Sequence, residues 1–150
     1  MLNDKYRKSL WTVFDKSCQT IKALEATLQS APDSWDMTVC AGMGTLLGNI
    51  YMSVENILRL FIEGIYGEKI TKDESWHKRL IDAGNEKGLL PLGIDGILHN
   101  MRSFRHRLTH GYGVDMNEDK LRKAIPEAIT AYENIEAHIR IKYPELENKE

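Results

Sequence analysis

The sequence predicts an all-α fold, an up-and-down bundle of four main helices with one short extra helix. Apolar residues recur at intervals of three and four over long stretches, which is the period of an amphipathic helix. No stretch of useful length alternates apolar with polar residues as strands do. The 150 residues, of which 42% are apolar and 28% charged, suit one domain large enough to bury a core. We therefore expect residues 1–150 to form a single helical domain.

The first two helices are predicted by apolar stripes and by the residues that end them. The first helix ends near Pro32, which cannot continue a helix. The second runs from about Asp36 to Tyr66, with Gly67 as its C-terminal signal. The first stripe comprises Leu10, Val13, Phe14, Ile21, Leu24 and Leu28. The second stripe comprises Leu47, Ile50, Val54, Ile57, Leu58, Phe61 and Ile65.

Three glycines, Gly42, Gly44 and Gly48, stand early in the second helix. A phosphate-binding loop would need the G-x-x-x-x-G-K-[ST] pattern after a strand, and the sequence has neither feature here. We interpret the glycines as small residues that let another helix approach closely, or as an irregular helix start.

Two helices are predicted in the middle of the chain. A short one covers Trp76 to Lys87 and is closed by Gly88. The next runs from Leu90 to Leu108 and presents one apolar stripe toward the core. That stripe comprises Ile94, Ile97, Leu98, Met101, Phe104 and Leu108.

The last helix is predicted to begin after Asn117, a residue that favours the N-cap position. Pro126 lies within the helical pattern and is expected to kink this helix or to divide it in two. Residues Pro144 to Glu150 are polar, and we expect them to be a frayed tail. The stripe comprises Leu121, Ala124, Ile125, Ala128, Tyr132, Ile135, Ile139 and Tyr143.

The cysteine content and the N-terminus indicate a cytoplasmic protein that does not cross a membrane. Cys18 and Cys40 are too few for a disulfide scaffold, and we interpret both as buried thiols, with a bridge between them left open. Charged residues within positions 4–8 interrupt any apolar N-terminal run, so no signal peptide is predicted. The apolar stretch from Ile57 to Ile65 is too short to span a bilayer.

Positive charge is concentrated in the segment from Arg102 to Tyr112. The wider stretch from Gly96 to Val114 contains three Arg, three His and no acidic residue, although the net charge of the chain is −2. Such a local patch suits a ligand that carries phosphate. The alternative is a solvated basic helix face, which is the usual explanation of a charged run.

Two details favour a binding site in this segment. Arg105 falls in the middle of the apolar stripe, where a guanidinium costs free energy unless it is paired or faces a wet cleft. His110 lies about 140° around the helix from Arg105, so one regular helix cannot direct both side chains to one point. Either the helix ends between them, as Gly111 and Gly113 suggest, or a second copy of the chain completes the site.

The pattern Arg105-x-x-x-x-His110-x-Tyr112 resembles the R-x4-H-x-Y motif of HEPN domains, and in particular of the HepT-like toxins. The resemblance implies a small all-helical ribonuclease of a toxin–antitoxin pair, active without a metal at a site formed across a homodimer. It also implies that a minimal nucleotidyltransferase antitoxin of the MntA-like type inhibits the toxin by attaching AMP to Tyr112.

The residue types suit the cleavage of RNA to a 2′,3′-cyclic phosphate. An imidazole exchanges protons near neutral pH, so His110 is assigned to proton transfer. Arg105 stays charged and offers forked donors to phosphate oxygens. We therefore assign it to binding the phosphate and stabilising the charge of the transition state. With one such His in each chain, two-fold pairing would supply both an acid and a base. No metal-ligand cluster is recognisable in the sequence, and no cofactor is expected.

Four further residues are candidates with open alternatives. Arg102 and Arg107 contact RNA phosphate or are solvated charges, and His106 assists His110 or lies on the surface. Glu55 lies at the edge of the second stripe and is the candidate carboxylate partner of Arg105, or else it faces solvent. The alternative to a nuclease is a non-catalytic HEPN module that binds RNA or nucleotide, or a helical dimerisation module.

Overall fold

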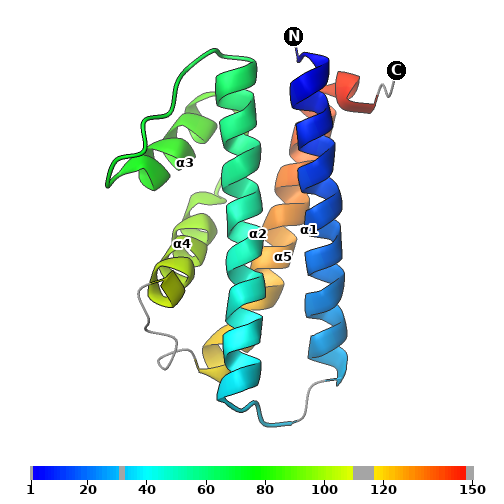
Figure 1. Cartoon of the computed structure of the whole chain (residues 1–150), viewed down its shortest axis with the longest axis vertical. Coiled ribbons are helices and arrows are strands. Elements are labelled where there is room, and N and C mark those ends of the chain that lie inside the picture. Colours follow the sequence, from blue (N-terminus) through cyan, green and yellow to red (C-terminus); the bar gives the residue numbers. More distant parts are fainter. Residues whose placement is uncertain (1, 31–32, 110–116, 148–150) are drawn as a thin grey trace.

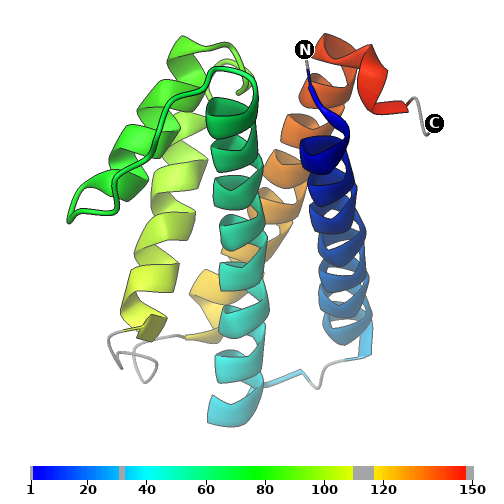
Figure 2. The ribbon, with the colours of Figure 1, turned by 45° about the horizontal axis from the view of Figure 1, so that its top comes forward.

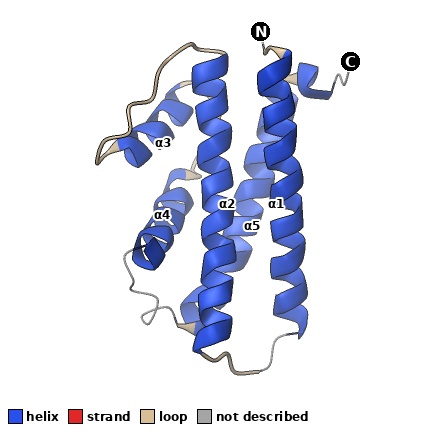
Figure 3. Ribbon diagram, in the orientation of Figure 1, coloured by secondary structure: helices blue, strands red, loops and turns tan. Residues whose placement is uncertain are grey.

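The computed structural model describes residues 2–30, 33–109 and 117–147, and all regular structure in them is helical (Figure 3). This confirms the predicted all-α bundle. The elements, in chain order, are α1 (Asp4–Ser30), α2 (Met37–Gly64), α3 (Trp76–Glu86), α4 (Asp95–Thr109), α5 (Glu118–Lys142) and a short 3-10 helix, η2 (Pro144–Glu147).

Helix α2 is the centre of the bundle and contacts α1, α3, α4 and α5. Helix α1 packs on one side of α2, whereas α3 and α4 lie on the other, and α5 passes behind (Figure 1). The same arrangement is visible when the top of the molecule is turned forward (Figure 2). The bundle therefore has one face made of α3 and α4, which α1 does not cover.

The apolar character of α2 extends well beyond Ile57–Ile65. By length and composition alone this helix would suit a membrane span, with a mean hydropathy of 1.2 over its most apolar window. In the structure its apolar side chains pack among the surrounding helices, and Ile50, Ile57 and Phe61 are fully buried. We therefore describe α2 as the core helix of the bundle.

Helices α2 and α5 both begin at an N-cap residue, which the sequence indicated for Asn117. The Asp36 carboxylate accepts the backbone N–H of Val39 at 2.9 Å, and the Asn117 side chain accepts that of Lys120 at 2.8 Å. Since α2 begins regularly, the early glycines do not mark an irregular helix start. A Cβ on Gly42 would meet open space, so no helix packs closely at that position, whereas Gly44 and Gly48 are buried.

The start of α4 differs from the prediction. The helix begins at Asp95 rather than at Leu90, because residues 91–94 form a turn. Pro91 disfavours a helical conformation for the residue before it, and Gly93 takes a positive φ of 81°. Leu90 and Ile94 are nevertheless buried, so the turn is packed against the core although it is not helical.

The prediction for Pro126 is settled in part. Helix α5 is continuous from Glu118 to Lys142, so Pro126 does not divide it into two helices. Pro126 itself is exposed, while Ile125 and Ala128 beside it are fully buried. The packing of this face maintains the helix where the sequence alone favours a break.

The C-terminal segment corrects a second expectation. Residues 144–147, predicted to be frayed, form η2, and Leu146 is fully buried. Its backbone carbonyl accepts the indole N–H of Trp11 at 2.8 Å, which ties the end of the chain to α1. One apolar side chain and one hydrogen bond therefore anchor a segment whose composition is otherwise polar; residues 148–150 lie outside the described part.

The two cysteines are both free, and only one of them is buried. The prediction for Cys40 is confirmed, whereas that for Cys18 is wrong, because its thiol is exposed. The buried position in this turn of α1 is the neighbouring Ser17, whose hydroxyl donates to the carbonyl of Val13 at 2.8 Å.

A carboxylate joins the loop between α1 and α2 to the start of α5. Glu118 accepts the backbone N–H of Trp35 at 2.6 Å and the Nε–H of Arg122 at 2.8 Å. The guanidinium of Arg122 also lies 4.3 Å from the centre of the Trp35 ring. The hydrogen bond from Trp35, followed by that from Arg122, lowers the pKa of Glu118.

Candidate functional site

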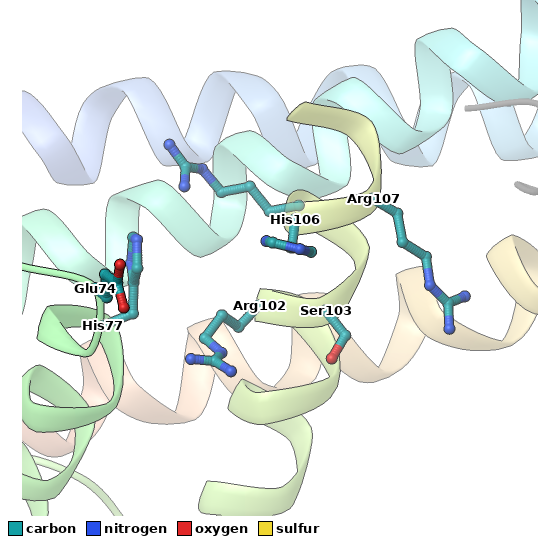
Figure 4. Close-up of a pocket in the computed structure, with 7 residues that line it drawn as sticks. Glu74, His77, Arg102, Ser103, His106 and Arg107 are labelled. Carbon is teal, nitrogen blue, oxygen red and sulfur yellow. The ribbon is translucent and has the colours of Figure 1, made fainter. Parts of the chain in front are cut away.

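A pocket of about 400 Å³ lies between α4 and the start of α3. Glu74 and His77 are on one wall, and Arg102 and His106 face them from α4 (Figure 4). Arg107 projects toward the other side of α4, away from His77 (Figure 4). The residues that line the pocket are Glu74, His77, Arg102, Ser103, Arg105, His106 and Arg107.

The lining carries positive charge, as the sequence predicted for this segment. It includes Arg102, Arg105 and Arg107 against a single carboxylate, that of Glu74. Arg102, Arg105 and His106 are spaced by three and four residues on α4, which places them on one face of the helix. Their convergence on one concave surface suits a phosphodiester, whose oxygens accept the forked donors of arginine.

Glu55 forms part of the buried wall behind this pocket. Its side chain is only 5% exposed, so the interpretation of a solvent-facing Glu55 is wrong. The carboxylate pairs with Nδ1 of His77, the second residue of α3. The predicted pair between Glu55 and Arg105 stays a prediction, and the established partner of the carboxylate is a histidine that lines the pocket.

The hydroxyl of Tyr51, one turn before Glu55 on α2, responds to the same group of charges. Burial raises the pKa of Tyr51, and the negative charge of Glu55 raises it further. Arg102 and Arg105 act in the opposite direction and lower this pKa. Because all three charges act on one hydroxyl, the buried carboxylate of α2 and the two guanidinium groups of α4 belong to one electrostatic cluster.

His77 is the residue of the site that the sequence did not indicate. Its ring packs against that of Trp76, with 3.8 Å between ring centroids and 35° between ring planes. The guanidinium of Arg59 lies 5.0 Å from the Trp76 ring on α3. Nothing in local spacing links His77 to the basic segment, and the only available signal was a carboxylate at the edge of a core stripe that needed a partner.

A second pocket, of about 410 Å³, lies between α4 and α5. It shares Ser103 and Arg107 with the first pocket, so the two hollows adjoin across α4. Lys120 and Lys123 add positive charge to it from α5, and Glu127 adds one negative charge. The basic surface therefore extends beyond one nucleotide-sized pocket, which suits a polynucleotide strand better than a single small anion.

His110 and Tyr112 lie outside the described residues, so their assigned roles stay predictions, as does a site shared by two subunits. Helix α4 is described as far as Thr109. In the part of the chain that the structure describes, no three His, Cys, Asp or Glu side chains are grouped as they would be around a metal ion.

Comparison with known proteins gives the family. A family model described as HepT-like protein matches residues 42–142, which is more than half of the chain and includes every residue of both pockets. No curated protein and no solved structure matches the sequence. The helical bundle, the basic pocket on α4 and this match agree, and the chain belongs to the HepT-like family of the HEPN superfamily.

Proposed function

We propose that this protein is a metal-independent endoribonuclease and the toxin of a toxin–antitoxin pair, acting in the cytoplasm. It cleaves RNA to 2′,3′-cyclic phosphate and 5′-hydroxyl ends. The HepT-like family is generally associated with ribonucleases, which supports the proposal. The observation that supports the proposal most directly is the convergence of Arg102, Arg105 and His106 on one pocket backed by a buried carboxylate.

The chemistry follows from what each side chain can do. Arg105 holds the non-bridging oxygens of the scissile phosphate and stabilises the charge that develops on them. His110 transfers a proton between the enzyme and one of the reacting oxygens. Arg102 and Arg107 bind flanking phosphates, and the exposed His106 lies on the same face of α4 as Arg102.

Regulation and assembly complete the proposal. A homodimer brings together groups from two chains at one phosphodiester, and a minimal nucleotidyltransferase antitoxin attaches AMP to Tyr112. The added phosphodiester is negatively charged and bulky, so it would repel RNA from the arginines and obstruct the pocket. The support for this part is the motif spacing of Arg105, His110 and Tyr112 together with the family match.

The test is RNA cleavage by the purified protein in excess EDTA. We expect the wild type to cleave under these conditions and His110→Ala to fold and cleave about 10²–10⁴-fold more slowly. Arg105→Ala should lose about 10²–10³-fold in kcat, since it removes a donor to the transition-state oxyanion. Arg7→Ala is the matched control, because Arg7 pairs with Asp4 on α1, outside the pocket.

Two results would contradict the proposal. Cleavage by His110→Ala at the wild-type rate would remove the proposed proton-transfer group. If wild type and variants all bound RNA but none cleaved it, the pocket would be a binding module rather than a nuclease. Mass spectrometry of the cleaved ends separates the cyclic phosphate from the 3′-hydroxyl and 5′-phosphate ends that other nucleases leave.

A further inference from the structure

RNA cleavage by attack of the 2′-hydroxyl requires two proton transfers, one from the attacking oxygen and one to the leaving oxygen. The family motif supplies one imidazole per chain, at His110. Two imidazoles outside the motif line the pocket. That of His106 lies on α4 with the arginines, whereas the other lies on α3, opposite Arg102 (Figure 4). This is His77, whose ring nitrogen Nδ1 is paired with the buried carboxylate of Glu55.

We infer that His77 is the general base of the site and that Glu55 is its positioning residue, an inference that rests on the proposed ribonuclease function. The assignment deepens that function by naming a catalytic group on α3. It also separates the two proton transfers between two different histidines of the chain.

The contact with Glu55 determines which nitrogen of His77 is available. An ionised carboxylate only accepts hydrogen bonds, so Nδ1 is the nitrogen that donates to Glu55. In the neutral imidazole Nε2 then carries the lone pair, and the proposed base is this form of His77. The Glu55 side chain is 5% exposed and that of His77 is 22% exposed, which places the carboxylate behind the ring and leaves part of the ring open. The neighbouring Trp76 ring restricts how far His77 can turn.

The substrate position follows from the opposite wall. A phosphate held by Arg102 and Arg105 lies in the same pocket as His77, and the 2′-hydroxyl of an RNA strand is attached to the ribose carbon next to the 3′-phosphate. A pocket of about 400 Å³ has room for one nucleotide. Glu74 lies beside His77 (Figure 4), and its charge disfavours a second phosphate on that wall, so the ribose side of the nucleotide suits it better.

The proposed step is balanced as follows. Nε2 of His77 takes the proton of the 2′-hydroxyl while O2′ forms a bond to phosphorus. The bond between phosphorus and O5′ breaks, and O5′ takes a proton from a protonated His110. The products are a 2′,3′-cyclic phosphate and a 5′-hydroxyl. Glu55 stabilises the imidazolium that forms on His77, as the carboxylate of a catalytic triad does, and this proton then passes to water.

The experiment compares two substrates whose leaving groups differ in their need for a proton. RNA has a ribose leaving oxygen that needs a proton, whereas uridine 3′-(4-nitrophenyl phosphate) releases nitrophenolate, which does not. The variant is His77→Asn, because the Asn amide nitrogen can replace Nδ1 as donor to Glu55 while nothing replaces Nε2. A general base is needed for both substrates, so we expect a loss of about 10²–10⁴-fold in kcat on each.

Comparison variants distinguish the role of His77 from a loss of structure. His138→Asn should cleave at close to the wild-type rate, because His138 bonds the carbonyl of Gly88 and lines neither pocket. His110→Ala should lose activity on RNA but recover much of it on the nitrophenyl substrate. Binding of a 2′-deoxy oligonucleotide to His77→Asn should stay within a few-fold of wild type. If His77→Asn does not fold, the double variant with Glu55→Gln removes the buried charge and should show the same loss on both substrates.

The outcomes distinguish a failure of the proposed role of His77 from a failure of the proposed ribonuclease function. If the wild type cleaves RNA and His77→Asn cleaves it at a similar rate, the inference is overturned while the ribonuclease function stands. Recovery of His77→Asn on the nitrophenyl substrate would also overturn it, because His77 would then supply the leaving-group proton instead. If the wild type cleaves neither substrate, the proposed function fails and the assignment of His77 fails with it.

Discussion

Replacing His77 with Ala should destabilise the protein, because it leaves the Glu55 carboxylate without its partner in a site that water barely reaches. Leaving a fully buried charge without its partner costs about 3–5 kcal/mol. Glu55 approaches that limit with a side chain 5% exposed, but His77 is 22% exposed, so water can occupy part of the vacated space. We therefore expect the free energy of unfolding to fall by about 2–3 kcal/mol. This value lies between the cost of an unsatisfied polar group and that of a buried unpaired charge.

The assay is a double-mutant cycle of His77→Ala and Glu55→Ala, followed by thermal and urea unfolding with circular dichroism. For a chain of this size each kcal/mol corresponds to about 2–4 °C in Tm, so His77→Ala should lower Tm by about 4–12 °C. The double variant has no buried charge left to desolvate. Its loss should therefore be smaller than the sum of the single losses by about 1–3 kcal/mol.

The control for this cycle is His138→Ala, which removes a histidine bonded to a backbone carbonyl rather than to a carboxylate. It should cost about 1 kcal/mol and add independently to Glu55→Ala. If the losses in unfolding free energy of His77→Ala and Glu55→Ala were strictly additive, the reasoning would be refuted. Additivity would show that the imidazole does not offset the cost of burying the carboxylate.

Three further predictions concern binding, assembly and pH. Replacing Lys120 and Lys123 with Gln should make the salt dependence of RNA binding shallower by about 0.7 per lost phosphate contact, measured by fluorescence anisotropy. Mixing inactive Arg105→Ala and His110→Ala proteins should restore part of the cleavage if one site uses both chains, and no recovery would indicate a site within one chain. Because its pKa is lowered in the folded state, Glu118 stabilises the fold above the ordinary glutamate pKa, and this stability is lost as the pH falls through the lowered value. The Tm difference between wild type and Glu118→Gln should therefore shrink in acid.

The helices were predictable because their signals are local. The caps at Asp36 and Asn117 and the end of α3 just before Gly88 each depend on residues within one turn of the helix end. The two errors in the helix ends have different causes, one local and one not. Leu90 continues an apolar pattern that Pro91 and Gly93 interrupt, and the C-terminal segment is ordered by a hydrogen bond from Trp11, 135 residues away.

The site was predictable in the same uneven way. Basic side chains spaced by three and four residues on one helix, such as Arg102, Arg105 and His106, can be recognised from sequence, because the helix itself brings them together. His77 and Glu55 are 22 residues apart on different helices, and only the packing of α3 against α2 joins them. Tertiary packing determines which residues pair in this way, and neither the composition nor the residues next to His77 in the sequence indicate its partner.

The position of Glu55 connects the core of the bundle to the pocket. Helix α2 contributes its apolar side chains to the centre of the fold, and at Glu55 it presents a carboxylate to the one histidine that lines the pocket from α3. Helix α1 packs on the opposite side of α2 (Figure 1), and no residue of α1 lines either pocket. Substitutions on α1 should therefore change the free energy of unfolding without changing the site, whereas a substitution at Glu55 should change both.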